Sequence, residues 1–424
     1  MKILFSTIGS RGDVQPLLAL ALELRALGHE ATFCVPPNFK EWVESFGMRC
    51  TPIGPDLRNL PSPPPGVKLP KPTLEQRRQF AAFTLLGQFQ VLPEAAKGCD
   101  LIVAASAIQV AARSVAEMLK IPYVFVAYSP AVLPSPEYPP AKMLTHYPQG
   151  LPAAVNHNLW RKDALEMDEP FGPTLNEQRA KLGLSAVDSV QRHVFTDRPW
   201  LAADPALAPA SKKSPMQIVQ TGAWLLPDQS PLPEDLERFL AKGKPPVYFG
   251  LGSMRGSEPM SRIVIEAARA AGLRAIVSQG WGNLGLIDSG DDCISIGDVS
   301  HEQLFPRVAA VVHHGGMGTT TSAARAGKPQ VIIPHIYDQF WMAARLEKLG
   351  VGVECPPRDQ LTVRTLTAAL REASRRGTTS RAESLAKNIT LDGAKRAAQR
   401  LVSEFGKPAA SGQKAKEREL AQAL

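Results

Sequence analysis

The chain has 424 residues, 44% of them hydrophobic and 21% charged, and a formal net charge of +8. This is the composition of a globular protein, and the length exceeds what one hydrophobic core usually organises, so two domains are expected. Lysine and arginine are spread along the chain without a basic run, which argues against a nucleic-acid partner. The modest positive charge suits an anionic substrate and a weak peripheral contact with an acidic membrane surface.

The five cysteines are scattered, odd in number and never form a Cys-x-x-Cys pair. This pattern is typical of a reducing compartment and gives no structural zinc site. The apolar start at residues 1–5 soon meets a glycine-containing loop at 9–13, so it predicts a first strand rather than a signal peptide. No apolar stretch approaches the roughly 20 residues of a membrane helix, and we expect a soluble, cytoplasmic protein.

The first half alternates short apolar runs with helical segments. Strands are expected at residues 3–7, 31–35, 48–53, 100–105 and 123–127, and helices at residues 15–27, 39–46 and 108–119. Such alternation predicts an α/β architecture, a parallel sheet with helices on both faces. Two proline-rich stretches, 61–66 and 130–140, predict surface loops because proline lacks the backbone donor that a sheet requires.

A second alternation begins near residue 247. Strands are expected at residues 247–251, 274–278, 293–296, 309–313, 330–333 and 351–354, with helices at 261–271 and 382–405. The proline-rich segment 199–233 separates the two halves. We therefore place an N-terminal domain at 1–210, a linker at 211–233, a C-terminal domain at 234–380, a last helix at 381–405 and a disordered tail at 406–424.

The strongest chemical signal follows the expected strand 309–313. It reads His313-His314-Gly315-Gly316-Met317-Gly318-Thr319-Thr320 and leads into a helix of small residues. A glycine turn at a helix N-terminus lets phosphate oxygens approach the backbone, and the unpaired amides and the helix dipole attract them. The histidines add further donors. The pattern predicts a diphosphate site.

A nicotinamide-dependent enzyme is disfavoured. A dinucleotide site needs a three-glycine fingerprint and a carboxylate at the end of the second strand. The stretch Gly250-Leu251-Gly252-Ser253 lacks the third glycine, and the second strand ends in Val35-Pro36-Pro37 without a carboxylate.

Three motifs together resemble the nucleotide-sugar-dependent glycosyltransferases of GT-B fold. They are Gly9-Ser10-Arg11-Gly12-Asp13-Val14-Gln15-Pro16, the cradle at 314–319 and Asp338-Gln339, and the stretch 195–201 supports them. The chain most resembles the bacterial glycosyltransferases of natural products, especially of glycopeptide antibiotics, and the related sterol glucosyltransferases. The resemblance covers residues 1 to about 405. It implies two doubly wound Rossmann-like domains facing across a cleft, with the last helix crossing back to the N-terminal domain.

Asp13 is the residue whose interpretation the resemblance changes most. By itself it predicts a helix N-cap, because Val14-Gln15-Pro16 opens a helix and aspartate is a preferred cap. The glycopeptide and sterol branches have aspartate at this position, where many relatives have a histidine base that deprotonates the acceptor hydroxyl. A carboxylate needs an apolar surrounding that raises its pKa for that role. Asp338 is the rival base, and the sequence leaves the choice open.

The resemblance also implies where the nucleotide-sugar donor binds. The expected contacts are Ser253, His314, Gly316, Gly318 and Thr319 at the diphosphate, Asp298 and Val299 at the nucleobase, Asp338 and Gln339 at the sugar, and Arg11 from the N-terminal domain. The alternative for Asp338 is a helix cap, and for Arg11 a solvated loop cation. Trp281 is expected in the core. Ser322 stands where plant relatives carry a ribose-binding glutamate, which leaves UDP and dTDP both open.

The implied reaction is an inverting transfer of a sugar, expected to be glucose, to a hydroxyl of an apolar natural product. No cofactor and no metal are expected, because cradle amides stabilise the leaving diphosphate. The acceptor is expected between the proline-rich loops and the segment 74–92 of the N-terminal domain. Two alternatives remain: a sterol or lipid glucosyltransferase at the membrane surface, and a nucleotide-sugar epimerase that needs no acceptor.

Overall fold

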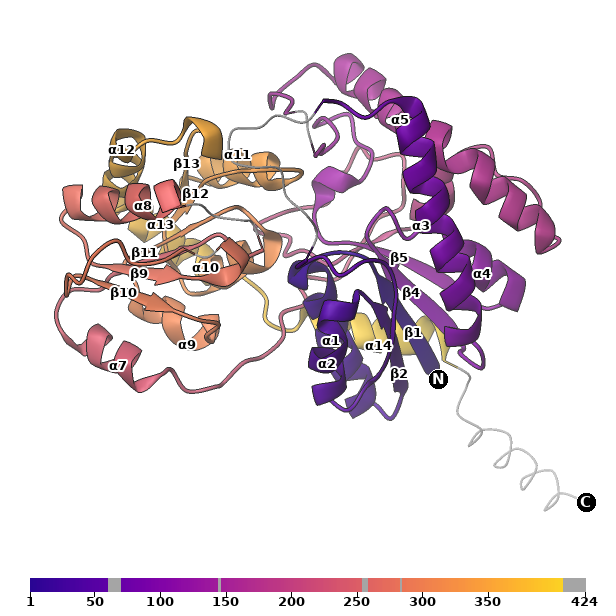
Figure 1. Ribbon diagram of the computed structural model, residues 1–424, viewed down its shortest axis with the longest axis horizontal. Coiled ribbons are helices and arrows are strands. Elements are labelled where there is room, and N and C mark those ends of the chain that lie inside the picture. Colours follow the sequence, from indigo (N-terminus) through magenta and orange to yellow (C-terminus); the bar gives the residue numbers. More distant parts are fainter. Residues whose placement is uncertain (60–69, 144–145, 254–257, 283, 407–424) are drawn as a thin grey trace, which may run out of the picture.

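The computed structural model describes residues 1–59, 70–143, 146–253, 258–282 and 284–406. It contains two parallel sheets side by side, the N-terminal one on the right of Figure 1 and the C-terminal one on the left. The α/β class and the pair of Rossmann-like domains expected from the alternating pattern are therefore confirmed. The proline-rich stretch 61–66 and most of the expected tail lie outside the described residues.

The N-terminal sheet has the strand order β3-β2-β1-β4-β5-β6-β7, and the C-terminal sheet has the order β10-β9-β8-β11-β12-β13. The strands are β1 (Lys2–Thr7), β2 (Glu30–Val35), β3 (Arg49–Pro52), β4 (Leu101–Ala105), β5 (Tyr123–Ala127), β6 (Trp200–Leu201), β7 (Val219–Gln220), β8 (Val247–Gly250), β9 (Ala275–Ser278), β10 (Cys293–Ile296), β11 (Ala310–His313), β12 (Gln330–Ile332) and β13 (Gly352–Glu354). The order reverses between β1 and β4, and again between β8 and β11. Ligands of such sheets bind beyond the strands' carboxyl ends at these points.

Helices cover both faces of each sheet. In the first domain these are α1 (Arg11–Ala26), α2 (Lys40–Ser45), α3 (Leu74–Ala95), α4 (Ala111–Leu119), α5 (Ala153–Lys181) and α6 (Val190–Phe195). The second has α7 (Glu234–Ala241), α8 (Glu258–Ala270), α9 (His301–Leu304), α10 (Met317–Arg325), α11 (Gln339–Leu349), α12 (Val363–Ala373) and α13 (Arg376–Ala386). None of the described helices is long and apolar enough to cross a bilayer.

The structure differs from the prediction at the linker and at the last helix. The expected linker 211–233 contains β7, which pairs with β6 and extends the N-terminal sheet beyond residue 210. A two-residue strand is too short to show periodicity, and the prolines around it hid it. The single helix expected at 382–405 is two helices, because the chain turns between α13 and α14 (Gly393–Phe405).

Helix α14 belongs to the N-terminal domain although it ends the described chain. It lies beside α1 under the N-terminal sheet (Figure 1). Its apolar residues share one buried cluster with those of α1 and β1, including Leu17, Leu18, Ala397 and Leu401. The chain therefore passes between the domains twice.

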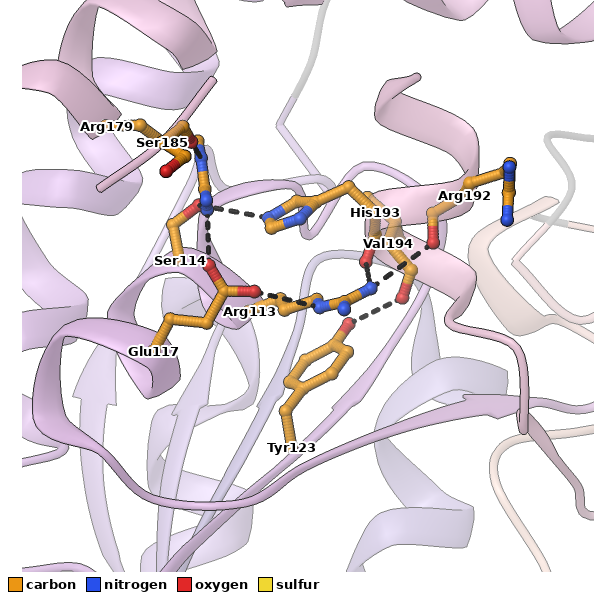
Figure 2. Close-up of polar contacts among 9 residues, drawn as sticks. All are labelled: Arg113, Ser114, Glu117, Tyr123, Arg179, Ser185, Arg192, His193 and Val194. Carbon is orange, nitrogen blue, oxygen red and sulfur yellow. Dashed lines mark hydrogen bonds and ion pairs between the residues drawn. The ribbon is translucent and has the colours of Figure 1, made fainter. Parts of the chain in front are cut away.

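A buried polar cluster fixes three helices of the N-terminal domain (Figure 2). Arg179 at the end of α5 is only 5% exposed, and its Nη1 donates to Ser114 Oγ at 2.9 Å and to Glu117 Oε2 at 2.6 Å. The Ser114 hydroxyl also forms a hydrogen bond with His193 Nε2 at 3.0 Å. Burial lowers the pKa of His193 to about 4, helped by the charges of Arg113 and Arg179, so the ring stays neutral.

Candidate active site

Asp13 lies in the first turn of α1, directly beyond the carboxyl end of β1. The helix begins at Arg11 with Ser10 as its N-cap, so Asp13 is not the cap itself. Its Oδ2 instead accepts from Ser10 N at 2.7 Å and from Ser10 Oγ at 3.2 Å. This position of the Asp13 carboxyl requires glycine at residue 9, because a Cβ there would overlap the carboxyl.

The surroundings of Asp13 suit a base. Burial raises its pKa from 3.8 to about 6; the two hydrogen bonds from Ser10 lower it, and the charge of Asp338 raises it further. A carboxyl of this kind is ionised near neutral pH yet accepts a proton more readily than an exposed aspartate.

Asp338 approaches from the other domain. It occupies the N-cap position of α11, but its side chain makes no capping hydrogen bond. Burial raises its pKa, while a hydrogen bond with Ser129 of the N-terminal domain opposes the rise. Asp13 and Asp338 thus bring the two expected bases together at the domain junction, one from each domain.

The glycine turn has the geometry of an anion cradle. Strand β11 ends at His313, Gly315 adopts φ +95°, and Gly316 is the N-cap of α10 without a side-chain cap. The first amide to bond within the helix is that of Thr320, which donates to Gly316 O at 3.0 Å. The preceding amides, including those of Gly318 and Thr319, are the orphan donors of the helix start and are available to a diphosphate.

The two histidines of the cradle have different roles. His313 is fully buried, with Nε2 bonded to Gln330 Oε1 at 2.8 Å and Nδ1 accepting from Gly315 N at 3.1 Å. It therefore packs and shapes the turn. Burial lowers the pKa of His314 to about 3, so its ring is neutral. That ring contacts Gly252, where a Cβ would lie 2.9 Å from His314 Cε1.

His335, which the sequence analysis did not single out, lies near His314. Its Nδ1 is 2.7 Å from the Ile333 carbonyl, so Nδ1 carries the hydrogen and Nε2 is an acceptor. Within the described chain, His314 Nδ1 and His335 Nε2 are both buried without a hydrogen-bond partner. Two open imidazole nitrogens beside an anion cradle fit a ligand that carries hydroxyls and phosphate. The only sequence signal for His335 is its place just beyond β12.

Gln339 is partly engaged by its own loop. Its Oε1 accepts from His335 N at 2.8 Å and from Ile336 N at 3.1 Å. The amide oxygen, expected at the sugar, therefore shapes the loop that carries Asp338.

Arg11 reaches the expected nucleobase segment rather than the cradle. Its Nη1 lies 2.9 Å from Asp298 Oδ2 across the domain junction, and its guanidinium lies 5.0 Å above the Trp42 ring. Trp281 is also at the junction, stacked on Phe39 of the N-terminal domain at 6.0 Å, and not in the C-terminal core as expected. These contacts join the domains on the nucleobase side.

The remaining expected donor residues lie around the same edge of the C-terminal sheet. Val299 is half-buried in the cluster that includes Ile296 and Leu304. Ser253 is half-buried just beyond β8. Among the residues that the structure describes, no group of three or more His, Cys, Asp or Glu side chains could hold a metal ion.

Two doubly wound domains, a helix-start phosphate cradle in the second and a carboxyl from each domain at the junction are the features of a GT-B glycosyltransferase. Comparison with known proteins agrees. Residues 3–134 match the glycosyltransferase family 28 N-terminal domain, and residues 289–399 match the erythromycin biosynthesis protein CIII-like C-terminal domain.

The chain is 42% identical to glycosyltransferase GtfE of Amycolatopsis orientalis over 414 residues, covering 96% of this chain and 99% of the relative. It is also 42% identical to the vancomycin aglycone glucosyltransferase of that organism over 408 residues, 95% and 97% of the two chains. A sterol 3-beta-glucosyltransferase of Arabidopsis thaliana is 31% identical over 91% of this chain and 63% of the relative. The chain belongs to the natural-product glycosyltransferases of GT-B fold.

Solved structures agree at the level of the fold. The glycosyltransferase of kitacinnamycin superposes with a TM-score of 0.71 at 18% identity, covering 95% of this chain and 99% of that one. Glycosyltransferase VinC in complex with dTDP gives 0.68 at 21% identity, with coverage of 95% and 99%.

Proposed function

We propose that this enzyme transfers glucose from a nucleoside diphosphate sugar to a hydroxyl of an apolar natural product, with inversion at the anomeric carbon. The proposal rests mainly on the position of Asp13. This residue of the N-terminal domain lies close enough to Asp338 of the C-terminal domain for the charge of Asp338 to raise its pKa. A base in one domain facing a diphosphate cradle in the other is what a single displacement needs.

The proposed reaction needs few groups. The Asp13 carboxylate takes the proton of the acceptor hydroxyl, the acceptor oxygen bonds to the anomeric carbon, and the bond from that carbon to the diphosphate breaks on the opposite face. The electron pair leaves with the diphosphate. Amides at the start of α10 and the neutral His314 ring stabilise that charge, while Asp338 and His335 accept hydrogen bonds from hydroxyls of the donor sugar.

We propose UDP-glucose as the donor, with dTDP-glucose as the competing choice. The relatives include different kinds of sugar transferase. One, 39% identical with 92% of its length covered, is a dTDP-epi-vancosaminyltransferase, and another is the vancomycin aglycone glucosyltransferase. Because amides and a helix dipole take the place of a metal in this proposal, activity should survive exhaustive dialysis against a chelator. If activity were lost on dialysis and restored by added Mg²⁺, the proposal that transfer needs no metal ion would be wrong.

The test is mass spectrometry of reactions that pair UDP-glucose or dTDP-glucose with the vancomycin aglycone and with pooled phenolic, macrolide and sterol aglycones. A hexose mass added to an aglycone supports the proposal and names the donor and acceptor class. Transfer only to sterols, together with binding to anionic liposomes, would favour the membrane-surface alternative. A changed sugar configuration in the donor with no aglycone product would show an epimerase instead.

A further inference from the structure

Tyr337, directly before Asp338, has an unusual backbone. Its φ is +52°, in the left-handed region that a bulky L-residue rarely adopts. The surrounding contacts hold it there: Tyr337 N donates to the Lys142 carbonyl of the N-terminal domain at 3.0 Å, and Gln339 Oε1 accepts from the two amides that precede the tyrosine. A strained conformation fixed in this way, next to Asp338, one of the two expected bases, points to a functional constraint.

The Tyr337 side chain is exposed beside the N-terminal domain, whose residues line a pocket together with it. It is 43% exposed, although the ring is large and mainly apolar. Burial of part of the ring raises the pKa of its phenol, and the charges of Asp13 and Asp338 raise it further. The phenol therefore lies within electrostatic reach of both expected bases, one on each side of the domain junction.

The neighbourhood of Tyr337 is aromatic. Together with Phe340 and Trp341 it lines a small pocket whose opposite wall comes from residues 131, 139–142, 146, 147 and 149 of the N-terminal domain. In that wall His146 stacks on Phe340 with ring centroids 4.1 Å apart. Within the described chain the Tyr337 hydroxyl has no hydrogen-bond partner, so no polar contact of its own accounts for the position of the ring.

We propose that Tyr337 is an acceptor-binding residue, whose ring packs against the apolar part of the acceptor beside the attacking hydroxyl and holds that hydroxyl at Asp13. This inference rests on the proposed function and adds a contact from the donor domain to the acceptor site. The backbone strain keeps the ring turned toward the junction instead of into the core. Acceptor recognition then depends on both domains, and a change at Tyr337 affects the acceptor far more than the donor.

The test compares Tyr337→Asn and Tyr337→Phe, with UDP-glucose or dTDP-glucose and the vancomycin aglycone or whichever aglycone of the panel the parent enzyme glucosylates. Asparagine tolerates the left-handed backbone but removes the ring. We expect it to lower kcat/KM for the acceptor by about tenfold or more, with donor KM and acceptor-free hydrolysis of the donor unchanged. Phenylalanine keeps the packing face and should stay within about twofold of the parent. The matched control is Lys120→Asn, at another left-handed residue (φ +56°), the C-cap of α4.

Each other outcome overturns the inference. Parental acceptor kinetics in Tyr337→Asn would mean that the ring does not touch the acceptor. An equal loss of kcat/KM for the donor and for the acceptor would mean that the ring only holds the loop. A fall in melting temperature that Lys120→Asn does not show would mean the same. A loss in Tyr337→Phe would assign the role to the hydroxyl. If the parent neither transfers nor hydrolyses either nucleotide sugar, the proposed function itself fails, which is a different result.

Discussion

Replacing Asp13 by asparagine should separate catalysis from folding. The rise of its pKa from 3.8 to about 6 means that the ionised form is disfavoured in the folded protein by about 3 kcal/mol at neutral pH. Asparagine has nearly the same shape, keeps an oxygen for the amide of Ser10 and has no charge to desolvate. We expect Asp13→Asn to be more stable than the parent at neutral pH by up to that amount, while transfer falls by about 10²–10⁴-fold.

The same pKa sets the pH dependence of the parent enzyme. The base must be ionised, so kcat/KM should fall by roughly tenfold between about pH 7 and about pH 5, whereas an ordinary aspartate would stay ionised to about pH 4. Asp338→Asn removes a charge that raises the Asp13 pKa, so the midpoint of any residual activity moves to lower pH. Ser10→Ala removes a hydrogen bond that favours the carboxylate, so the midpoint moves to higher pH.

The assay follows product by mass spectrometry across a pH series and follows unfolding of the same samples by thermal melting. The stability difference between parent and Asp13→Asn should grow as pH rises from about 4 to about 6, because over that range the folded parent still binds this proton whereas the unfolded parent has released it, so folding of the parent becomes less favourable as pH rises. A near-parental rate in Asp13→Asn, with the same pH midpoint, would refute the assignment and leave Asp338 as the base. Loss of rate together with a lower melting temperature would mean that the variant is misfolded.

Two further substitutions probe the cradle and the N-terminal domain. Gly316→Ala should raise the KM for the donor by about tenfold with little change in melting temperature, because the added Cβ would overlap Nε2 of His314. The control is Gly285→Ala, where a Cβ meets nothing within 4 Å. An unchanged donor KM in Gly316→Ala would argue against His314 as a donor contact. Arg179→Met should lower the free energy of unfolding in urea by about 1–3 kcal/mol, because the Ser185 carbonyl and Glu117 Oε2 lose the donor that Arg179 gives them, while Arg113 still pairs with Glu117 Oε1 at 3.1 Å. A loss below about 0.5 kcal/mol would show that the Arg179 contacts do not stabilise the domain.

Much of the fold was predictable because parallel strands buried on both faces give short continuous apolar runs. Strands β5 and β10 occur at the expected residues, whereas the two-residue strands β6 and β7 are too short to give a pattern. Helix α5 was not predicted, since Pro170 and Pro173 lie inside it and a proline usually ends a helix.

The candidate site was predictable as far as its motifs, which lie in the turns after β1, β11 and β12. Contacts that depend on loop and domain geometry were not. The Gln339 side chain turns into its own loop, Arg11 pairs with a residue 287 positions away, and one buried ring nitrogen of His335 has no partner within the described chain. No local pattern of residue types encodes these arrangements.

The return of α14 to the first domain bears on how the protein is made. The ribosome completes the N-terminal sheet early, but α14 (Gly393–Phe405), which covers the apolar face of α1, is synthesised after the whole donor domain. During translation that face, with Leu17 and Leu18, has no native cover. The N-terminal domain is therefore finished only after the whole donor domain has been synthesised, and a premature stop before α14 should yield an aggregation-prone product rather than a shorter working enzyme.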